Sequence, residues 1–110
     1  MSECVFCRIV NNEIPSEKVG KSESFIAIKD LHPKAPVHNL LIPKRHIEKP
    51  DELDESELRE LFDLSKNVAE NSGVRGDGYR LIFNVGKKAG QEIDHVHLHL
   101  IGGSQAKSLY

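Results

Sequence analysis

The feature that most constrains the fold is a run near the carboxyl end of the chain in which histidine alternates with aliphatic residues. The run is His95-Val96-His97-Leu98-His99-Leu100-Ile101. Side chains of a β-strand point alternately to its two faces, so this order predicts aliphatic side chains in a core and three imidazoles on the opposite face. On that face the rings would repeat about every 6.6 Å, which is twice the rise per residue. The run therefore predicts a strand, from 93 to 101, with one buried face.

The three imidazoles of this run are open to more than one interpretation. They could be the polar side of a half-exposed strand, or they could bind a metal as three-histidine zinc sites do. The run holds three of the six histidines in the chain, so their regular spacing is poorly explained by chance. The spacing favours a chemical role for this face of the sheet.

Shorter patterns predict the other elements. We expect a short helix within 3–12, strands at 24–28, 38–42 and 78–84, and a loop at 32–36 that contains two prolines. Strands joined by short connections, together with one long helix, favour an antiparallel α+β domain.

The long helix is predicted from about residue 55 to 72. Asp54 and Glu57 have the spacing of a capping box, and Gly73 provides a carboxyl-terminal stop. The predicted apolar stripe of this helix consists of Leu58, Leu61, Phe62, Val68 and Ala69.

Composition limits the class of protein. The 110 residues suit one domain spanning 1–110, and 38% of them are hydrophobic, enough to form a core. A net charge of −2 without a basic stripe gives no expectation of nucleic-acid binding. No apolar run approaches the roughly 20 residues that cross a bilayer, and the polar amino terminus does not resemble a secretory signal. We therefore expect a cytoplasmic protein without a membrane partner.

The two cysteines, Cys4 and Cys7, are separated by two residues. This spacing suits a metal site or a redox pair in a reducing compartment, and two inert core thiols are the third interpretation. A thioredoxin-like redox motif expects a βαβ context, which the predicted elements lack. A metal site needs further ligands, and His46 is the candidate for the third.

Several motifs, taken together, resemble one known family. They are the alternating histidines followed by Gly102-Gly103, together with Glu13-Ile14-Pro15, Ala35-Pro36-Val37-His38, Leu41-Ile42-Pro43-Lys44-Arg45-His46-Ile47 and Gly90-Gln91-Glu92. In this order they resemble the histidine triad (HIT) superfamily, and within it the Hint branch, over nearly the whole chain. The resemblance implies a five-stranded antiparallel sheet with two helices, which pairs with a second subunit to form a ten-stranded sheet. A homodimer is therefore expected.

The resemblance also implies a mechanism. In the family the middle histidine, here His97, attacks the α-phosphorus of a nucleotide ester or phosphoramidate, and water then cleaves the nucleotidyl-imidazole. A backbone carbonyl of the strand is expected to hold the other ring nitrogen of His97. His99 matches the residue that contacts phosphate oxygens and the leaving group, His95 completes the triad, and His38 matches a histidine that supports it. By itself, His38 could equally be a core histidine.

A purine nucleotide, such as AMP, GMP or their phosphoramidates, is the partner that the resemblance implies. The positions that match the family's nucleotide-binding residues are Ile14, Ile28, Asp30, Leu31, Asn84, Gly90, Gln91 and Ile93, together with His97 and His99. Asp30 would accept from the ribose hydroxyls, although an acidic residue there is also an ordinary turn residue. The glycine-rich loop at 86–91 suits a phosphate, but such a loop is often only a turn. Glu92 stands where some members carry a serine donor.

Some members of the family place a cysteine pair and two histidines around zinc. The corresponding positions here are Cys4, Cys7, His46 and His95. A closed Cys2His2 set indicates a structural zinc, and we expect no metal to be required for catalysis.

The function that the resemblance implies is hydrolysis of purine nucleoside phosphoramidates. A dinucleoside polyphosphate hydrolase of the Fhit type shares the nucleophile, but there His-x-His-x-His-x-x is followed by Pro-Arg, whereas Gly102-Gly103 stand here. A nucleotidyltransferase is less expected, because its branch has a second domain. A nucleotide-binding adaptor with incidental hydrolysis is the alternative from another class.

Overall fold

The computed structural model describes residues 3–106. In chain order the elements are α1 (Val5–Val10), β1 (Lys18–Lys21), β2 (Phe25–Lys29), β3 (Val37–Pro43), the short 3-10 helix η1 (Pro50–Glu52), α2 (Glu55–Asn71), β4 (Tyr79–Ile82), the 3-10 helix η2 (Lys87–Ala89) and β5 (Leu98–Gly102). The strands form one antiparallel sheet in the order β1-β2-β3-β5-β4. The α+β prediction is confirmed, including five strands and two α-helices.

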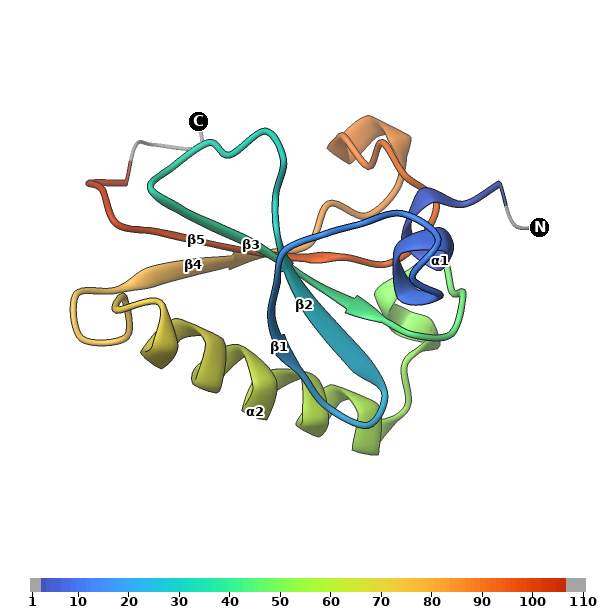
Figure 1. Ribbon diagram of the computed structural model, residues 1–110, viewed down its shortest axis with the longest axis horizontal. Helices are drawn as coiled ribbons and strands as arrows, with labels where there is room; N and C mark the ends of the chain where they lie inside the picture. The colour runs from blue at the N-terminus through green and yellow to red at the C-terminus, as the bar shows by residue number, and fades with distance from the viewer. Residues whose placement is uncertain (1–2, 107–110) are drawn as a thin grey trace.

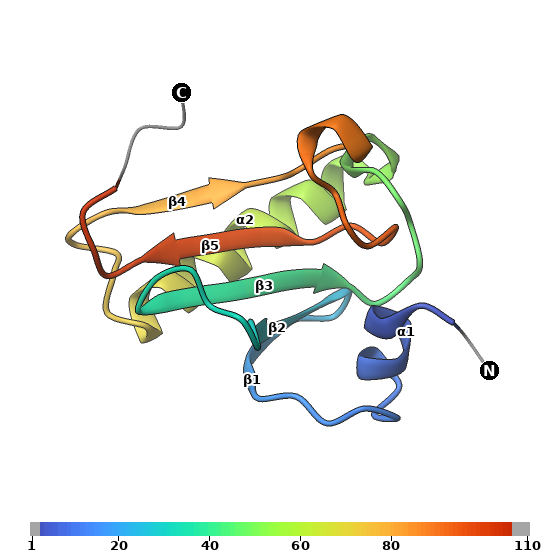
Figure 2. The same cartoon turned by 90° about the horizontal axis from the view of Figure 1, so that it is seen from above.

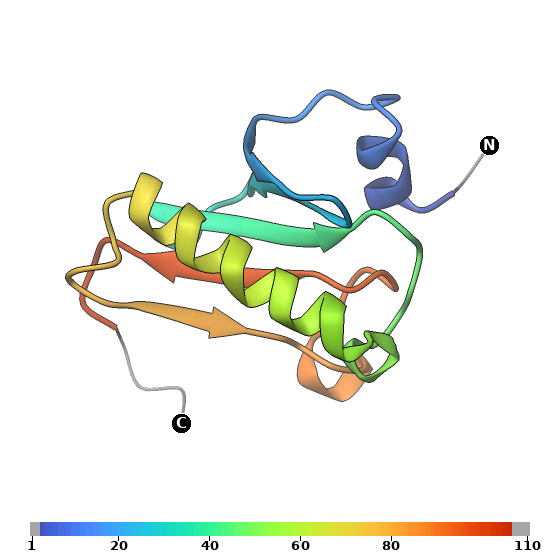
Figure 3. The ribbon, with the colours of Figure 1, turned by 90° about the horizontal axis from the view of Figure 1, so that it is seen from below.

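The two helices lie on opposite sides of the sheet. Figures 1 and 3 show α2 crossing one face diagonally, and in Figure 2 this helix lies behind the sheet while α1 lies beside the end of β3. The core between α2 and the sheet includes Phe25, Leu41, Leu61, Val68 and Leu100. On the other side, Phe6 and Ile9 of α1 pack on aliphatic side chains of β2 and β3. No helix among residues 3–106 is long and apolar enough to cross a membrane.

The predicted ends of α2 are confirmed. The Asp54 carboxylate accepts from the Glu57 N–H at 2.8 Å, and the Glu57 carboxylate accepts from the Asp54 N–H at 3.1 Å. After the cap at Ser72, Gly73 adopts a positive φ of 78°, a conformation that a side chain would disfavour. Local capping chemistry therefore sets both ends of this helix.

The predicted apolar stripe of α2 was wrong at two positions. Leu61, Val68 and Ala69 are buried, but Leu58 is 37% exposed and Phe62 is 57% exposed. Successive residues turn by about 100° around a helix, so Phe62 faces a different side of the helix from its buried neighbour Leu61. The buried face instead continues through Glu57, Leu64 and Ser65.

The first strand and the start of the last one differ from expectation. None of the four strand patterns predicted β1, which is a short edge strand with an irregular register near Lys18. The last strand was predicted from 93 but begins at Leu98, which pairs with Leu41. Farther along β3 stands Pro43, which has no N–H to donate to a ladder. Its carbonyl instead accepts from the His95 ring at 2.8 Å.

An ion pair joins α2 to the segment after β3. Arg45 donates through Nε and Nη2 to the two carboxylate oxygens of Glu57, at 2.9 and 2.7 Å. These bonds, followed by the one from the Asp54 N–H, lower the pKa of Glu57 to about 2. Since the folded-state pKa lies below the ordinary value, the pair stabilises the fold above that value and is lost as the pH falls toward 2.

We expect Glu57→Gln to reduce the free energy of unfolding at neutral pH by about 1–3 kcal/mol, as loss of a charge-assisted bidentate bond does. Urea titrations at several pH values measure this, with Glu55→Gln as the control, because Glu55 is an exposed glutamate in the same first turn of α2. The difference between wild type and Glu57→Gln should shrink as the pH is lowered from 4.5 to 2. A difference independent of pH would contradict this role of the pair.

Candidate functional site

The triad histidines come together at the α1 side of the sheet. The ring centroids of His97 and His99 are 5.1 Å apart, and Phe6 of α1 contacts the rings of His95 and His97 edge-on, at 5.8 and 5.0 Å. Val96, Leu98 and Leu100 are buried, as predicted from the alternation. Of the three triad histidines only His99 lies within β5, because the chain bends at 93–95 and is irregular up to residue 97.

Hydrogen bonds assign the proton on His97. Its Nδ1 is 2.8 Å from the backbone carbonyl of His95, which can only accept. Nδ1 therefore carries the hydrogen, and in the neutral ring Nε2 carries the lone pair. Nε2 has no hydrogen-bond partner among residues 3–106 and is not a buried unsatisfied atom. The side chain is thus arranged to present a nucleophilic nitrogen to solvent.

His95 is held on both sides of its ring and has no exposed surface. Its Nε2 donates to the Pro43 carbonyl at 2.8 Å, so Nδ1 carries the lone pair. Burial lowers the pKa of His95. The neutral form of the ring therefore presents Nδ1 to the groups on its other side, which are Cys4, Cys7 and His46.

These four side chains form a cluster with metal-site geometry. His95 Nδ1 is 3.3 Å from Cys4 Sγ and 3.2 Å from His46 Nδ1, and His46 Nδ1 is 3.3 Å from Cys7 Sγ. Tetrahedral zinc with its usual bond lengths would place its ligand nitrogens about 3.3 Å apart and sulfur and nitrogen about 3.5 Å apart. The donor set and its spacing therefore fit a zinc ion, and the three segments that supply it are α1, the end of β3 and the start of the triad.

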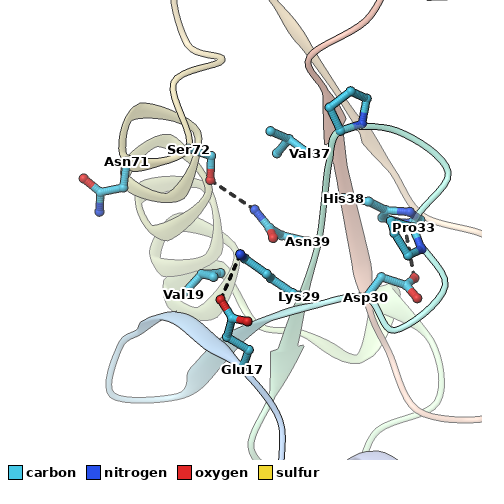
Figure 4. A pocket seen from close by; sticks show the side chains of 11 residues that line it. Glu17, Val19, Lys29, Asp30, Pro33, Val37, His38, Asn39, Asn71 and Ser72 are labelled. Atoms are coloured by element: carbon cyan, nitrogen blue, oxygen red, sulfur yellow. Dashed lines mark hydrogen bonds and ion pairs between the residues drawn. The ribbon is translucent and has the colours of Figure 1, made fainter.

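His38 lies on β3, the strand next to β5, and Asp30 directly follows β2; both are close to His99. His38 Nε2 is 2.9 Å from His99 Nδ1 and 3.3 Å from Asp30 Oδ2, and Figure 4 shows Asp30 pointing toward His38. Burial is the main cause that lowers the pKa of His38 and that lowers the pKa of His99 to about 4. Both rings are therefore neutral at physiological pH.

The glycine-rich loop is held in place by Gln91. The buried Gln91 side chain accepts from the Gly86 N–H at 2.8 Å and donates to the carbonyls of Glu48 at 2.9 Å and Ile93 at 3.1 Å. Its own N–H donates to the Gly86 carbonyl. Gln91, expected near a ribose or phosphate, therefore uses its polar groups to shape the loop, whose Gly86 and Gly90 both have a φ of 87°.

The other expected nucleotide-binding residues are placed unevenly. Ile14, Ile28 and Ile93 belong to the apolar cluster that also contains Phe6, next to His97. Leu31 is 83% exposed beside Asp30. Asn84 is half-buried after β4 and makes no hydrogen bond to the histidines within residues 3–106.

A separate cleft of about 490 Å³ opens on the other side of β3. Asn39 and Ser72 are hydrogen-bonded at 3.2 Å in it, and Glu17 and Lys29 form an ion pair at 2.8 Å (Figure 4). His38 and Asp30 also border this cleft, but His97 and His99 do not. The cleft therefore shares His38 and Asp30 with the surroundings of the triad but does not include the rings of His97 and His99.

Two kinds of functional group were missed by sequence reasoning. Phe6 contacts two triad rings, and its only signal was a position between the two cysteines. The other kind is a backbone group, namely the carbonyl of Pro43 and the N–H of Lys34, which donates to His38 Nδ1 at 3.0 Å. No side-chain pattern announces either of these.

Comparison with known proteins agrees with this geometry. A family model described as the HIT domain matches residues 11–106. An uncharacterised HIT-like protein of Methanocaldococcus jannaschii is 40% identical over 99 residues, 89% of this chain and 77% of that protein. The purine nucleoside phosphoramidase of Escherichia coli is 38% identical over 104 residues, 92% of this chain and 87% of that protein. The structure of a HIT family hydrolase from Clostridium thermocellum superimposes with a TM-score of 0.92 at 43% identity, covering 100% of this chain and 99% of the other.

Proposed function

Because the chain belongs to the HIT family, we propose that it is a hydrolase of purine nucleoside phosphoramidates that works through a nucleotidyl-histidine intermediate on His97. The observation that carries the proposal is the bond from His97 Nδ1 to the His95 carbonyl, which leaves the Nε2 lone pair open. The phosphoramidase of Escherichia coli, which is 38% identical, supports the choice of substrate class.

The proposed reaction has two displacements. His97 Nε2 attacks the α-phosphorus, a bond from phosphorus to this nitrogen forms, and the bond to the leaving amine breaks as the amine takes a proton. His99 stands beside His97 and, as a neutral ring, donates a hydrogen bond to the leaving nitrogen, which takes its proton from solvent through this contact. Water then attacks the nucleotidyl-imidazole, a proton returns to solvent, and the nucleoside monophosphate and neutral His97 are released.

The loop at 86–91 supplies the environment for the phosphoryl group. The N–H groups of Gly86, Ala89, Gly90 and Gln91 are already bonded within the loop. Its proposed contribution is therefore the positive charge of Lys87 and Lys88. The Gln91 side chain keeps the loop in this shape through its three hydrogen bonds. Asp30 and Leu31 are proposed to contact the nucleoside at the other side of the site.

The test is mass spectrometry of the protein during turnover of an adenosine phosphoramidate, without added metal. A rapidly quenched reaction should contain protein heavier by one adenylyl group, and peptide mapping should locate that group on His97. Free AMP should accumulate afterwards. Adenylylation of another residue, or turnover that is abolished by a chelator while the protein remains folded, would contradict the proposed nucleophile.

We also propose that zinc occupies the site formed by Cys4, Cys7, His46 and His95. When bound, the ion supplies a closed four-coordinate link and no open position for catalysis. The donor distances support this assignment. His46 and the two cysteines would then fix α1 and the end of β3 against His95.

A homodimer formed through β4 is the assembly that we propose. This strand is one edge of the sheet, and its outer side has no partner strand among residues 3–106. Three exposed apolar side chains support it: Leu58 and Phe62 on α2 and Val85 just after β4. Figure 3 shows the first half of α2 crossing toward the β4 edge.

We expect Phe62→Glu to convert the dimer to a monomer, because a charge would replace a desolvated aromatic ring at the interface. Sedimentation velocity at micromolar concentration measures the change, with Lys18→Glu on the opposite edge strand as the control. A wild-type protein that sediments as a monomer would contradict the proposed assembly.

A further inference from the structure

His38 lies between a backbone donor and the ring of a triad histidine. The Lys34 N–H donates to His38 Nδ1 at 3.0 Å, and His38 Nε2 is 2.9 Å from His99 Nδ1. The His38 side chain is almost wholly buried. Both of its ring nitrogens therefore have protein partners, and these partners decide where its proton lies.

The Lys34 N–H determines the tautomer of His38. Because this N–H must donate, Nδ1 of His38 has to carry a lone pair, and the single proton of the neutral ring is on Nε2. That proton faces two acceptors, His99 Nδ1 at 2.9 Å and Asp30 Oδ2 at 3.3 Å. The shorter contact is the one to His99.

The tautomer of His99 follows from that of His38. A ring whose Nδ1 accepts from His38 carries its own proton on Nε2. That Nε2 has no partner among residues 3–106 and is not a buried unsatisfied atom, so it reaches the open side of the site. At Nε2, His97 therefore has a lone pair, whereas His99 has an N–H that can donate.

Hydrogen bonds of Asp30 and two prolines hold the segment that carries the Lys34 N–H. The Asp30 N–H donates to the His38 carbonyl at 3.0 Å, and Asp30 Oδ1 accepts from the His32 N–H at 2.8 Å. Pro33 precedes Lys34 directly, and Pro36 follows it two residues later, which further restricts the backbone. The donor is therefore held at a fixed place.

We propose that the backbone N–H of Lys34 is a positioning group that, through His38, makes His99 a hydrogen-bond donor at Nε2. The role of this donor at the leaving amine rests on the proposed function. The assignment also disfavours a metal ion between Asp30, His38 and His99, whose ligand atoms lie within 4.8 Å of one another. Ligation through His38 Nε2 would require a ring without a proton on either nitrogen.

Nitrogen-15 NMR of the imidazoles tests the assignment directly in the wild-type protein. Long-range proton–nitrogen correlations at a pH where the rings are neutral should show His38 and His99 protonated on Nε2, and His97 protonated on Nδ1. The measurement needs neither substrate nor a variant. A proton on Nδ1 of His38 or of His99 would overturn the proposal.

Lys34→Pro removes the N–H, whereas Lys34→Ala keeps it and removes only an exposed side chain. We expect Lys34→Pro to lower kcat about 10- to 100-fold with little change in KM, as loss of a group that orients a catalytic residue does. The loss should be large for the phosphoramidate of a basic alkylamine and small for the nitrophenyl ester of AMP, whose leaving group needs no proton. Lys34→Ala should stay within about twofold for both substrates.

Equal losses on both substrates in folded Lys34→Pro would overturn the role of the N–H in hydrogen-bond donation to the leaving group. If that variant does not fold, the wild-type NMR experiment still decides the tautomers. Failure of the proposed function would look different: the nitrogen-15 pattern would be as expected, but neither substrate would be turned over.

Discussion

Replacing His97 with alanine should abolish turnover of an adenosine phosphoramidate, with kcat reduced at least about 10⁴-fold, because the nucleophile itself is removed. The nucleotidyl adduct should disappear from the mass spectrum at the same time. Neither of the other two triad histidines presents an equivalent atom, since His95 Nε2 is bonded to the Pro43 carbonyl and His99 Nε2 carries a proton. Release of AMP measured by chromatography gives the rate.

The control is His32→Ala, which removes an exposed histidine side chain outside the triad and should leave kcat within about twofold. Nucleotide binding separates chemistry from recognition, because titration calorimetry with AMP should show His97→Ala still binding. If His97→Ala kept a tenth or more of the wild-type rate, His97 could not be the nucleophile.

Replacing His46 with alanine should have the largest effect on stability. Wild-type protein should contain one zinc per chain by elemental analysis, and His46→Ala should retain far less. At a free zinc concentration about 1,000 times the Kd, binding stabilises the folded state by about 4 kcal/mol, so a loss of this order is expected in the variant. His46 is exposed, so its truncation leaves no cavity that would explain such a loss.

His32→Ala serves again as the control, because it removes the same side chain from another exposed position. Treating the wild type with a strong chelator should lower its free energy of unfolding to that of His46→Ala, and the chelator should have no further effect on the variant. Wild-type protein purified without zinc, or with a free energy of unfolding insensitive to the chelator, would contradict the proposed metal site.

Elements set by neighbouring residues were predictable from the sequence. The Asp54 and Glu57 capping box marks the start of α2 through bonds that span three residues. The alternation at 95–101 predicts which side chains are buried, because strand geometry alone separates the two faces. The fifth strand, β1, was expected only from the resemblance to the histidine triad family, because its own residues form no strand pattern.

Features that depend on distant residues were not predictable in this way. The last strand begins only at Leu98, because the Val96 N–H before it donates to the Ile47 carbonyl and not to β3. Gln91 was expected beside the ligand, yet the carbonyls of Glu48 and Ile93 and the N–H of Gly86 engage its side chain. Their positions follow from the assembled fold and leave no trace in the residue types themselves.

The side chain and the backbone carbonyl of His95 serve different centres, which limits the experiments that can study either centre alone. Its imidazole faces the cysteine pair, whereas its peptide oxygen orients the ring two positions later. A substitution of His95 would therefore disturb both centres, and a change in rate measured on that variant could not be assigned to one of them. Experiments meant to separate the two should leave this position intact and alter the outlying ligands instead.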